Sequence, residues 1–158
     1  MKAQPNNALL THDPAIIEKA DKVIFPGVGE AGSAMQKLRQ TGLDTILPKL
    51  SQPVLGICLG MQLLCIHSEE GDTVGLGIFA STVKRFDNRL KVPQMGWNQL
   101  INLKGPLFRG IPEKAYMYLV HSYYVPLNEN TTAEADYGLR FSVALQKDNF
   151  FGVQFHPE

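Results

Sequence analysis

The feature that most constrains the fold is one cysteine framed by two glycines, Gly56-Ile-Cys-Leu-Gly60, between two apolar segments. Glycines allow a tight strand-to-helix turn that larger side chains would obstruct. In such a turn Cys58 is exposed at the amino end of a helix, where free N–H groups and the helix dipole favour the thiolate. The alternative is an ordinary buried turn in which the cysteine fills the core.

The segments around this turn predict an alternating order of strands and helices. Residues 22–29 read as a buried strand that enters a Gly-rich loop, and residues 32–47 as an amphipathic helix interrupted near Gly42. Residues 52–57 predict a second buried strand. Residues 58–67 predict a helix, because three apolar residues recur there at i, i+4 and i+7. This βαβα order predicts an α/β fold with a mostly parallel central sheet and flanking helices.

The remaining composition predicts one domain, residues 1–158, with a β-rich second half. From Gly75 onward the apolar segments are short, β-branched or aromatic, and separated by Pro, Gly and Asn. Fifteen basic and fifteen acidic residues give a formal net charge of +0, without the basic patch that nucleic-acid binding requires. Two cysteines and no apolar stretch of membrane-spanning length predict a cytoplasmic protein without a membrane partner.

A thiolate nucleophile needs a base, and His156 is the best candidate among four histidines. It follows an apolar strand and precedes Pro157, which favours extended backbone. Residues two apart in extended chain face the same way, so Glu158 can orient the imidazole. The alternative is a plain turn after a strand. We expect His121 and Cys65 to be packed in the core.

Acyl transfer also requires donors for a developing oxyanion. The Pro-Gly-Val-Gly segment, residues 26–29, ends a predicted strand and can offer backbone N–H groups beside that of Leu59. The alternative is an ordinary β-to-α turn. Neither the cysteine spacing nor the glycine loops form a metal-binding or nucleotide-binding motif, so we predict no metal and no cofactor.

Several motifs together resemble the class I glutamine amidotransferases, and more closely the glutaminase subunits of imidazole glycerol phosphate synthase. They are GICLGMQLL, PGVG, PQMGWN, VHSYY and QKDNFFGVQFHPE. The resemblance implies a flavodoxin-like three-layer fold and a Cys58-His156-Glu158 triad. In that triad Cys58 attacks the side-chain amide of glutamine, His156 protonates the departing ammonia, and water resolves a γ-glutamyl thioester.

The resemblance also implies the residues around the substrate and the partner. In this family, ammonia passes to a separate cyclase subunit of histidine biosynthesis, which forms imidazole glycerol phosphate and aminoimidazole carboxamide ribotide. The implied interface is the PQMGWN segment, with Gln94, Met95, Gly96, Trp97 and Asn98; the alternative is that Met-Gly-Trp lies in the core. The implied oxyanion and glutamine-binding residues are Gly27, Val28, Gly29, Leu59, Gln62, Ser122 and Tyr123.

The sequence departs from the family pattern at both ends. MKAQPNNALL stands where the family has a first strand and helix, and the family's last helix has no counterpart after Glu158. We therefore expect a chain truncated at both ends and less stable than a longer relative. Two alternatives stay open: a paralogous glutaminase subunit serving another amination, such as surface-sugar synthesis, and an impaired subunit that only binds the cyclase.

Overall fold

The central element is a five-stranded sheet that is parallel on one side and antiparallel on the other. In the computed structural model, which describes residues 8–157, β1 pairs with β2 and β2 with β11 in parallel, whereas β10 is antiparallel to β11 and β9. The parallel strands bring their carboxyl ends to one edge. The strands, in sheet order, are β1 (Val23–Gly27), β2 (Val54–Cys58), β11 (Phe150–Val153), β10 (Arg140–Lys147) and β9 (Thr131–Asp136).

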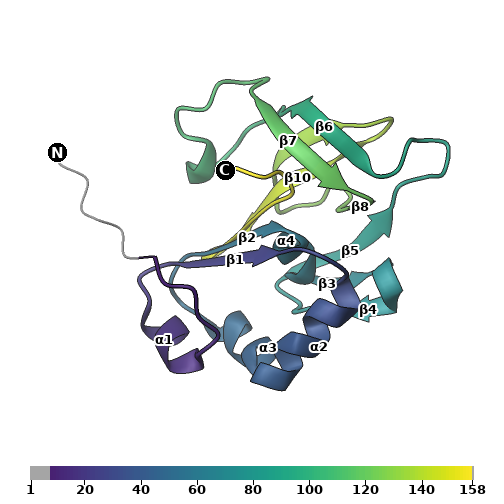
Figure 1. The fold of residues 1–158 in the computed structure, drawn as a ribbon. Coiled ribbons are helices and arrows are strands. Elements are labelled where there is room, and N and C mark those ends of the chain that lie inside the picture. Colours follow the sequence, from purple (N-terminus) through teal and green to yellow (C-terminus); the bar gives the residue numbers. More distant parts are fainter. Residues whose placement is uncertain (1–7, 158) are drawn as a thin grey trace.

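The first three helices gather on one side of β1 and β2 (Figure 1). They are α1 (Pro14–Lys19), α2 (Ala31–Thr41) and α3 (Leu43–Ile46), followed by a 3₁₀ turn, η1 (Leu47–Lys49). The Glu30 carboxylate caps α2 by accepting from the backbone of Gly32 and Ser33. Gly42 ends α2 in the left-handed conformation, at φ 72°, which glycine adopts at little cost. The predicted interruption near Gly42 is confirmed.

Two smaller sheets make up most of the remaining structure. The β6–β7 pair lies on the opposite side of β1 and β2 from the helices (Figure 1). Its strands are β6 (Gln94–Gln99) and β7 (Tyr116–His121), antiparallel to each other. The other sheet has the order β4 (Thr73–Val74), β3 (Cys65–Ser68), β5 (Phe79–Arg85) and β8 (Tyr123–Tyr124), with 3₁₀ turns η2 (Glu70–Asp72) and η3 (Pro106–Phe108) in the connections.

The predicted helix over residues 58–67 is wrong beyond its first half. The helix that follows Cys58 is α4 (Leu59–Leu63), and the chain then becomes strand β3. Ser68 of β3 pairs with both Thr73 of β4 and Val83 of β5, so backbone pairing on two sides replaces the helical hydrogen bonds. Ile66, assigned to the buried helix face, is instead an exposed strand residue.

The predicted burial of the first strand is also wrong. Within the described residues β1 is an edge strand with alternating burial, and its Ile24 side chain is 65% exposed. Strand β2 fits the prediction better, because it lies between β1 and β11. Strands β3, β4 and β9 had no counterpart in the sequence analysis.

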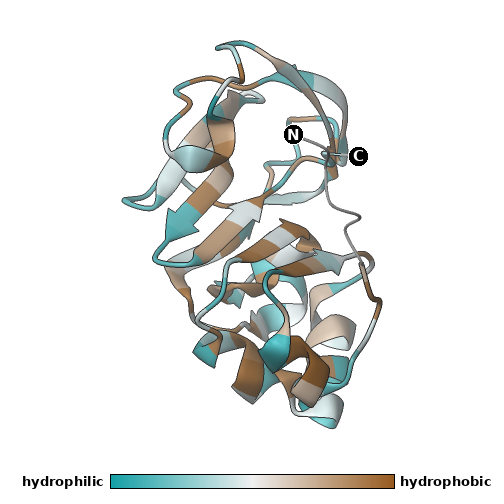
Figure 2. Ribbon diagram, turned by 90° about the vertical axis from the view of Figure 1, so that its left-hand side faces the viewer, coloured by the Kyte–Doolittle hydropathy of each residue, from teal (hydrophilic) through white to brown (hydrophobic). Residues whose placement is uncertain are grey.

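Two apolar clusters fill the molecule. One packs the helices against β1, β2, β3 and β5, and the other lies between β6, β7, β9 and β10. Figure 2 shows apolar stretches on the central strands and on the helices beside them. The α/β fold and the β-rich second half are confirmed. Between residues 8 and 157, no helix is both long and apolar enough to cross a membrane.

Candidate active site

Cys58 lines a pocket of about 230 Å³ where the carboxyl end of β2 meets the end of β7. The pocket gathers residues from five separate parts of the chain, all at or just beyond the ends of helices and strands. It therefore has the position expected for a ligand site in a sheet with parallel strands. The lining residues are Gly29, Cys58, Leu59, Gln62, Glu70, Pro93, Val120, His121, Ser122 and Tyr123.

The turn at Cys58 is sharp and is made possible by its two glycines. Cys58 has φ 54° and ψ −114°, a backbone conformation that L residues rarely adopt. A Cβ on Gly60 would collide with the carbonyl oxygen of Phe25 in β1, and one on Gly56 would lie 2.9 Å from the backbone of Gly60. The spacing Gly-x-Cys-x-Gly therefore reflects close packing of α4 against β1 and β2, with the thiol at the turn. The predicted strand-to-helix turn is present.

His156 lies in the segment that follows β11, the neighbour of β2. Val153 of β11 is in register with Ile57, one residue before Cys58. The backbone N–H of His156 donates to the carbonyl of Tyr118 in β7, at 3.0 Å. His156 is thus tied to β7, whose carboxyl end forms one wall of the Cys58 pocket. Glu158 lies outside the described residues, and the triad stays a prediction.

The predicted oxyanion segment runs directly beside the cysteine. Gly27, the last residue of β1, is the register partner of Cys58. Gly29, at φ 96°, reaches the pocket. Val28 does not line it, and its side chain is 85% exposed. Since an oxyanion donor acts through its backbone N–H, the exposure of the Val28 side chain leaves that predicted role untested.

Of the seven predicted oxyanion and glutamine-binding residues, five line the pocket. They are Gly29, Leu59, Gln62, Ser122 and Tyr123. Tyr123 contributes its carbonyl oxygen, which accepts from Gln62 Nε2 at 3.1 Å and bonds His121 Nδ1 at 2.6 Å. The family resemblance thus grouped residues that follow β1 and β7 with residues of α4 and β8, and the fold brings them to one place.

Glu70 is a pocket residue that the sequence analysis missed. One carboxylate oxygen accepts from the backbone N–H of Ala31 at the start of α2, at 2.9 Å. Partial burial raises the pKa of the Glu70 carboxyl, and the nearby charge of Glu30 adds to the rise. Glu70 lies in η2, which follows the unpredicted strand β3, so no sequence pattern pointed to it.

His121 is the packed core histidine that we expected, although it also touches the pocket. Its ring lies among Phe86 and Phe141, with centroids 5.3 and 5.4 Å away. Burial lowers its pKa to about 4. Cys65 is likewise in the core, as expected, and burial raises the pKa of its thiol to about 12. Neither group has the properties of a general base or a nucleophile at neutral pH.

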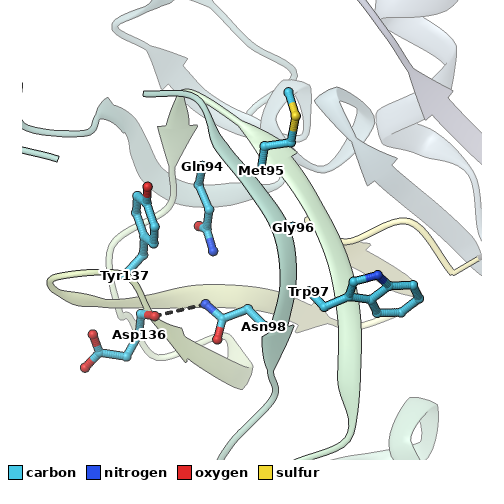
Figure 3. Close-up of a pocket in the computed structure, with 7 residues that line it drawn as sticks. All are labelled: Gln94, Met95, Gly96, Trp97, Asn98, Asp136 and Tyr137. Carbon is cyan, nitrogen blue, oxygen red and sulfur yellow. Dashed lines mark hydrogen bonds between the residues drawn. The ribbon is translucent and has the colours of Figure 1, made fainter. Parts of the chain in front are cut away.

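The PQMGWN segment forms β6 and lines a second pocket, of about 280 Å³, together with Asp136 and Tyr137. Figure 3 shows that Gln94 and Asn98 lie on the side of Asp136 and Tyr137, whereas Met95 and Trp97 project from the other side of the strand. The Asn98 amide donates to the carbonyl of Asp136 at 2.9 Å.

The two faces of β6 differ in their exposure to solvent. The side chains of Met95 and Trp97 are 65% and 70% exposed, and Trp97 stacks edge-on against Tyr118 of β7. This outward face is not core, which removes the alternative that Met-Gly-Trp is buried. Gln94, in contrast, is buried on the inner face.

Comparison with known proteins places this chain in a family. The model of the class-I glutamine amidotransferase domain matches residues 3–158. The chain therefore belongs to the class-I glutamine amidotransferase family.

Within residues 8–157 no three His, Cys, Asp or Glu side chains are grouped as a metal site would require.

Two relatives show which kind of glutamine amidotransferase the chain is similar to. The chain is 55% identical, over 96% of its length and 79% of the relative's, to the imidazole glycerol phosphate synthase subunit HisH of Bacteroides fragilis strain YCH46. It is 51% identical, over 95% of its length and 78% of the relative's, to the subunit of the same name from Yersinia pseudotuberculosis serotype I strain IP32953.

Solved structures show the same fold at low sequence identity. One glutamine amidotransferase aligns with TM-score 0.70 and 17% identity, over 93% of this chain and 76% of its own. Another, from Thermotoga maritima, aligns with TM-score 0.64 and 19% identity, over 89% of this chain and 57% of its own.

Proposed function

We propose that this chain is the glutamine amidotransferase subunit of an imidazole glycerol phosphate synthase, hydrolysing L-glutamine and delivering ammonia to a cyclase subunit in histidine biosynthesis. The observation that carries the proposal is the gathering of Cys58, Gly29, Leu59, Gln62, Ser122 and Tyr123 around one pocket. The identity of about 50% to subunits of that name supports the choice of enzyme. The small number of cysteines, Cys58 and Cys65, fits the cytoplasmic location that belongs to the same proposal.

In the proposed reaction, the Cys58 thiolate attacks the side-chain carbonyl carbon of glutamine. Backbone N–H groups of Val28 and Leu59 stabilise the resulting oxyanion. His156, oriented by Glu158, protonates the amide nitrogen as the C–N bond breaks, so ammonia leaves and a thioester remains. Water, deprotonated by the same imidazole, then hydrolyses the thioester to glutamate and restores the thiolate.

The remaining polar groups of the pocket suit the other end of the substrate. Glutamine carries an α-ammonium and an α-carboxylate, and the Glu70 carboxylate on the pocket wall provides the negative charge that an ammonium group requires. Gln62, Ser122 and Tyr123 add neutral polar groups to the same lining. Amino-acid specificity would then come from the charge of Glu70 together with hydrogen bonding by these neutral groups.

The outward face of β6 is the proposed contact with the cyclase subunit. Exposed Trp97 and Met95 are of the residue types enriched at protein interfaces. The next strand, β7, ends at the Cys58 pocket, because Val120 and His121 line it. A partner bound on β6 would therefore lie one strand away from the proposed catalytic pocket.

The test is ammonia release from glutamine, measured with and without the histidine-pathway cyclase and its ribonucleotide. We expect turnover that rises when the loaded cyclase is added and that disappears in Cys58→Ala, with Cys65→Ala as the matched control that retains it. A rate unaffected by this cyclase would contradict the assignment to histidine biosynthesis and favour another amination. Selective labelling of Cys58 by a glutamine-like electrophile separates an active glutaminase from a subunit that only binds.

A further inference from the structure

Gln154 is a fully buried polar residue in contact with the proposed nucleophile. It follows β11, and its backbone N–H donates to the carbonyl of Val143 at 2.8 Å, which fixes it between β11 and β10. Its side-chain Nε2 donates to Cys58 Sγ at 3.7 Å. A buried amide is stable only if its polar atoms are bonded, so its contacts define how it is oriented.

The orientation of the Gln154 amide is set by the backbone carbonyl of Tyr123, through the side chain of Gln62. The carbonyl oxygen of Tyr123 can only accept, so the side chain of Gln62 must present its NH₂ group there. The same NH₂ group donates to Gln154 Oε1 at 2.8 Å. Gln154 Oε1 therefore faces Gln62, and its NH₂ group faces the sulfur. The reverse orientation would set two NH₂ groups against each other.

A donor at this position favours the charged form of the sulfur. A hydrogen bond to a thiolate stabilises it relative to the thiol and lowers the cysteine pKa. We infer that Gln154, held by Gln62, is a positioning residue that stabilises and orients the Cys58 thiolate. This inference rests on the proposed role of Cys58 as nucleophile and goes beyond it, because Gln154 is not one of the residues that line the substrate pocket.

Other titratable groups near the thiol are separable from this effect. Glu70, His121 and Tyr123 line the same pocket, and His156 follows Gln154 by two residues. All four residues are retained in the Gln154 variants. A change in the titration of Cys58 in a Gln154 variant therefore reports on the amide.

The experiment measures the rate of Cys58 alkylation by iodoacetamide against pH in the full chain, with peptide mass spectrometry assigning the site. Gln154→Met keeps the volume and removes the donor, and we expect the midpoint of the profile to rise by about one pH unit, which is about tenfold less thiolate below the midpoint. Gln154→Glu keeps the acceptor for Gln62 and adds negative charge, so its midpoint should rise further. Gln40→Met, on the exposed face of α2, is the control and should match the parent.

A second variant tests the orientation itself. Gln62→Met leaves Gln154 in place but removes the group that holds it, and we expect a smaller rise of the midpoint in the same direction. Unchanged midpoints in both Met variants would overturn the inference and assign Gln154 to packing alone. A rise in Gln154→Glu without one in Gln154→Met would also overturn it, because added charge would then be the only cause.

The inference and the proposed function fail separately. Alkylation requires no glutamine, so a shifted midpoint in a chain that releases no ammonia would sustain the role of Gln154 and contradict the glutaminase. Where ammonia is released, Gln154→Met should lower kcat about tenfold with little change in KM, because the residue touches the nucleophile and not the pocket. A rise in KM of about tenfold with an unchanged kcat would contradict a positioning role.

Discussion

The close packing behind the Cys58 turn predicts the effect of one methyl group at Gly60. Gly60→Ala should gain helix propensity, since alanine is favoured over glycine within a helix by about 1 kcal/mol. The added Cβ would collide with the carbonyl oxygen of Phe25, which is backbone in a paired strand and cannot rotate away. Overpacking of this kind costs about 1–3 kcal/mol. Because the backbone oxygen cannot move away, the cost lies at the upper end of this range, and we expect a net loss of about 2 kcal/mol in the free energy of unfolding, or about 4–8 °C in Tm for a chain of this size.

The matched control is Gly32→Ala, a second glycine within a helix. There the new Cβ would meet the hydroxyl of Thr73 and the Glu30 carboxylate that caps α2, which are side-chain ends that can shift slightly and not paired backbone. A partial loss of this cap and the gain in helix propensity, each at most about 1 kcal/mol, offset each other, so the stability of Gly32→Ala in urea should equal that of the parent. If Gly60→Ala proves as stable as Gly32→Ala, α4 is not packed against β1 as described, and the explanation of the Gly-x-Cys-x-Gly spacing is refuted.

Three further predictions concern charge and association. Hydrogen bonds from Ser33 and Gly32 lower the pKa of the Glu30 carboxyl. The stability that this cap contributes is therefore present above pH 4.5 and is lost as the pH falls through the lowered pKa. In Glu30→Gln, urea unfolding at a series of acidic pH values should no longer show this loss. Burial lowers the pKa of His121 from 6.5 to about 4, so the unfolded chain binds a proton at a higher pH than the folded chain does. The free energy of unfolding should therefore fall by about 3 kcal/mol as the pH is lowered from 6.5 to 4. Urea unfolding of His121→Gln should not show this fall. Trp97→Ala should weaken binding to the cyclase subunit at least tenfold by calorimetry, whereas Val74→Ala, at a similarly exposed site on β4, should leave it unchanged.

The elements that the sequence predicted correctly are those that depend on residues close together in the chain. The strand-to-helix turn at Cys58 follows from glycine spacing, and the break at Gly42 follows from a glycine in the left-handed conformation. The helix beyond Leu63 was wrong because pairing of β3 with β4 and β5 outweighs the apolar spacing of the segment. The pairing of β3 with β5 joins residues on either side of the β4 connection, and the spacing of apolar residues within one segment carries no signal for it.

The site was predicted in the same uneven way. The motifs led to Cys58, Gln62 and Ser122 because each motif is continuous in the sequence. Glu70, which lines the pocket, and Gln154, which contacts Cys58, were missed because their roles depend on contacts across the fold, from η2 to α2 and from the end of β11 to α4. Whether a glutamine side chain is buried and facing a sulfur cannot be predicted from its neighbours in the chain.

The arrangement gives a physical reason why the proposed nucleophile stands on a strained residue. The positive φ of Cys58 is held by packing of α4 on β1 on one side and of β11 on the other, so relaxation of the turn would disturb both contacts. The sulfur also accepts from the amide of Gln154, whose own orientation derives from the Tyr123 carbonyl in β8, and that carbonyl is bonded to His121 at the end of β7. Since β7 pairs with β6 along its whole length, displacement of the exposed β6 face can reach the thiol through a continuous set of hydrogen bonds. A partner bound at Trp97 therefore has a structural route by which it can alter the reactivity of Cys58.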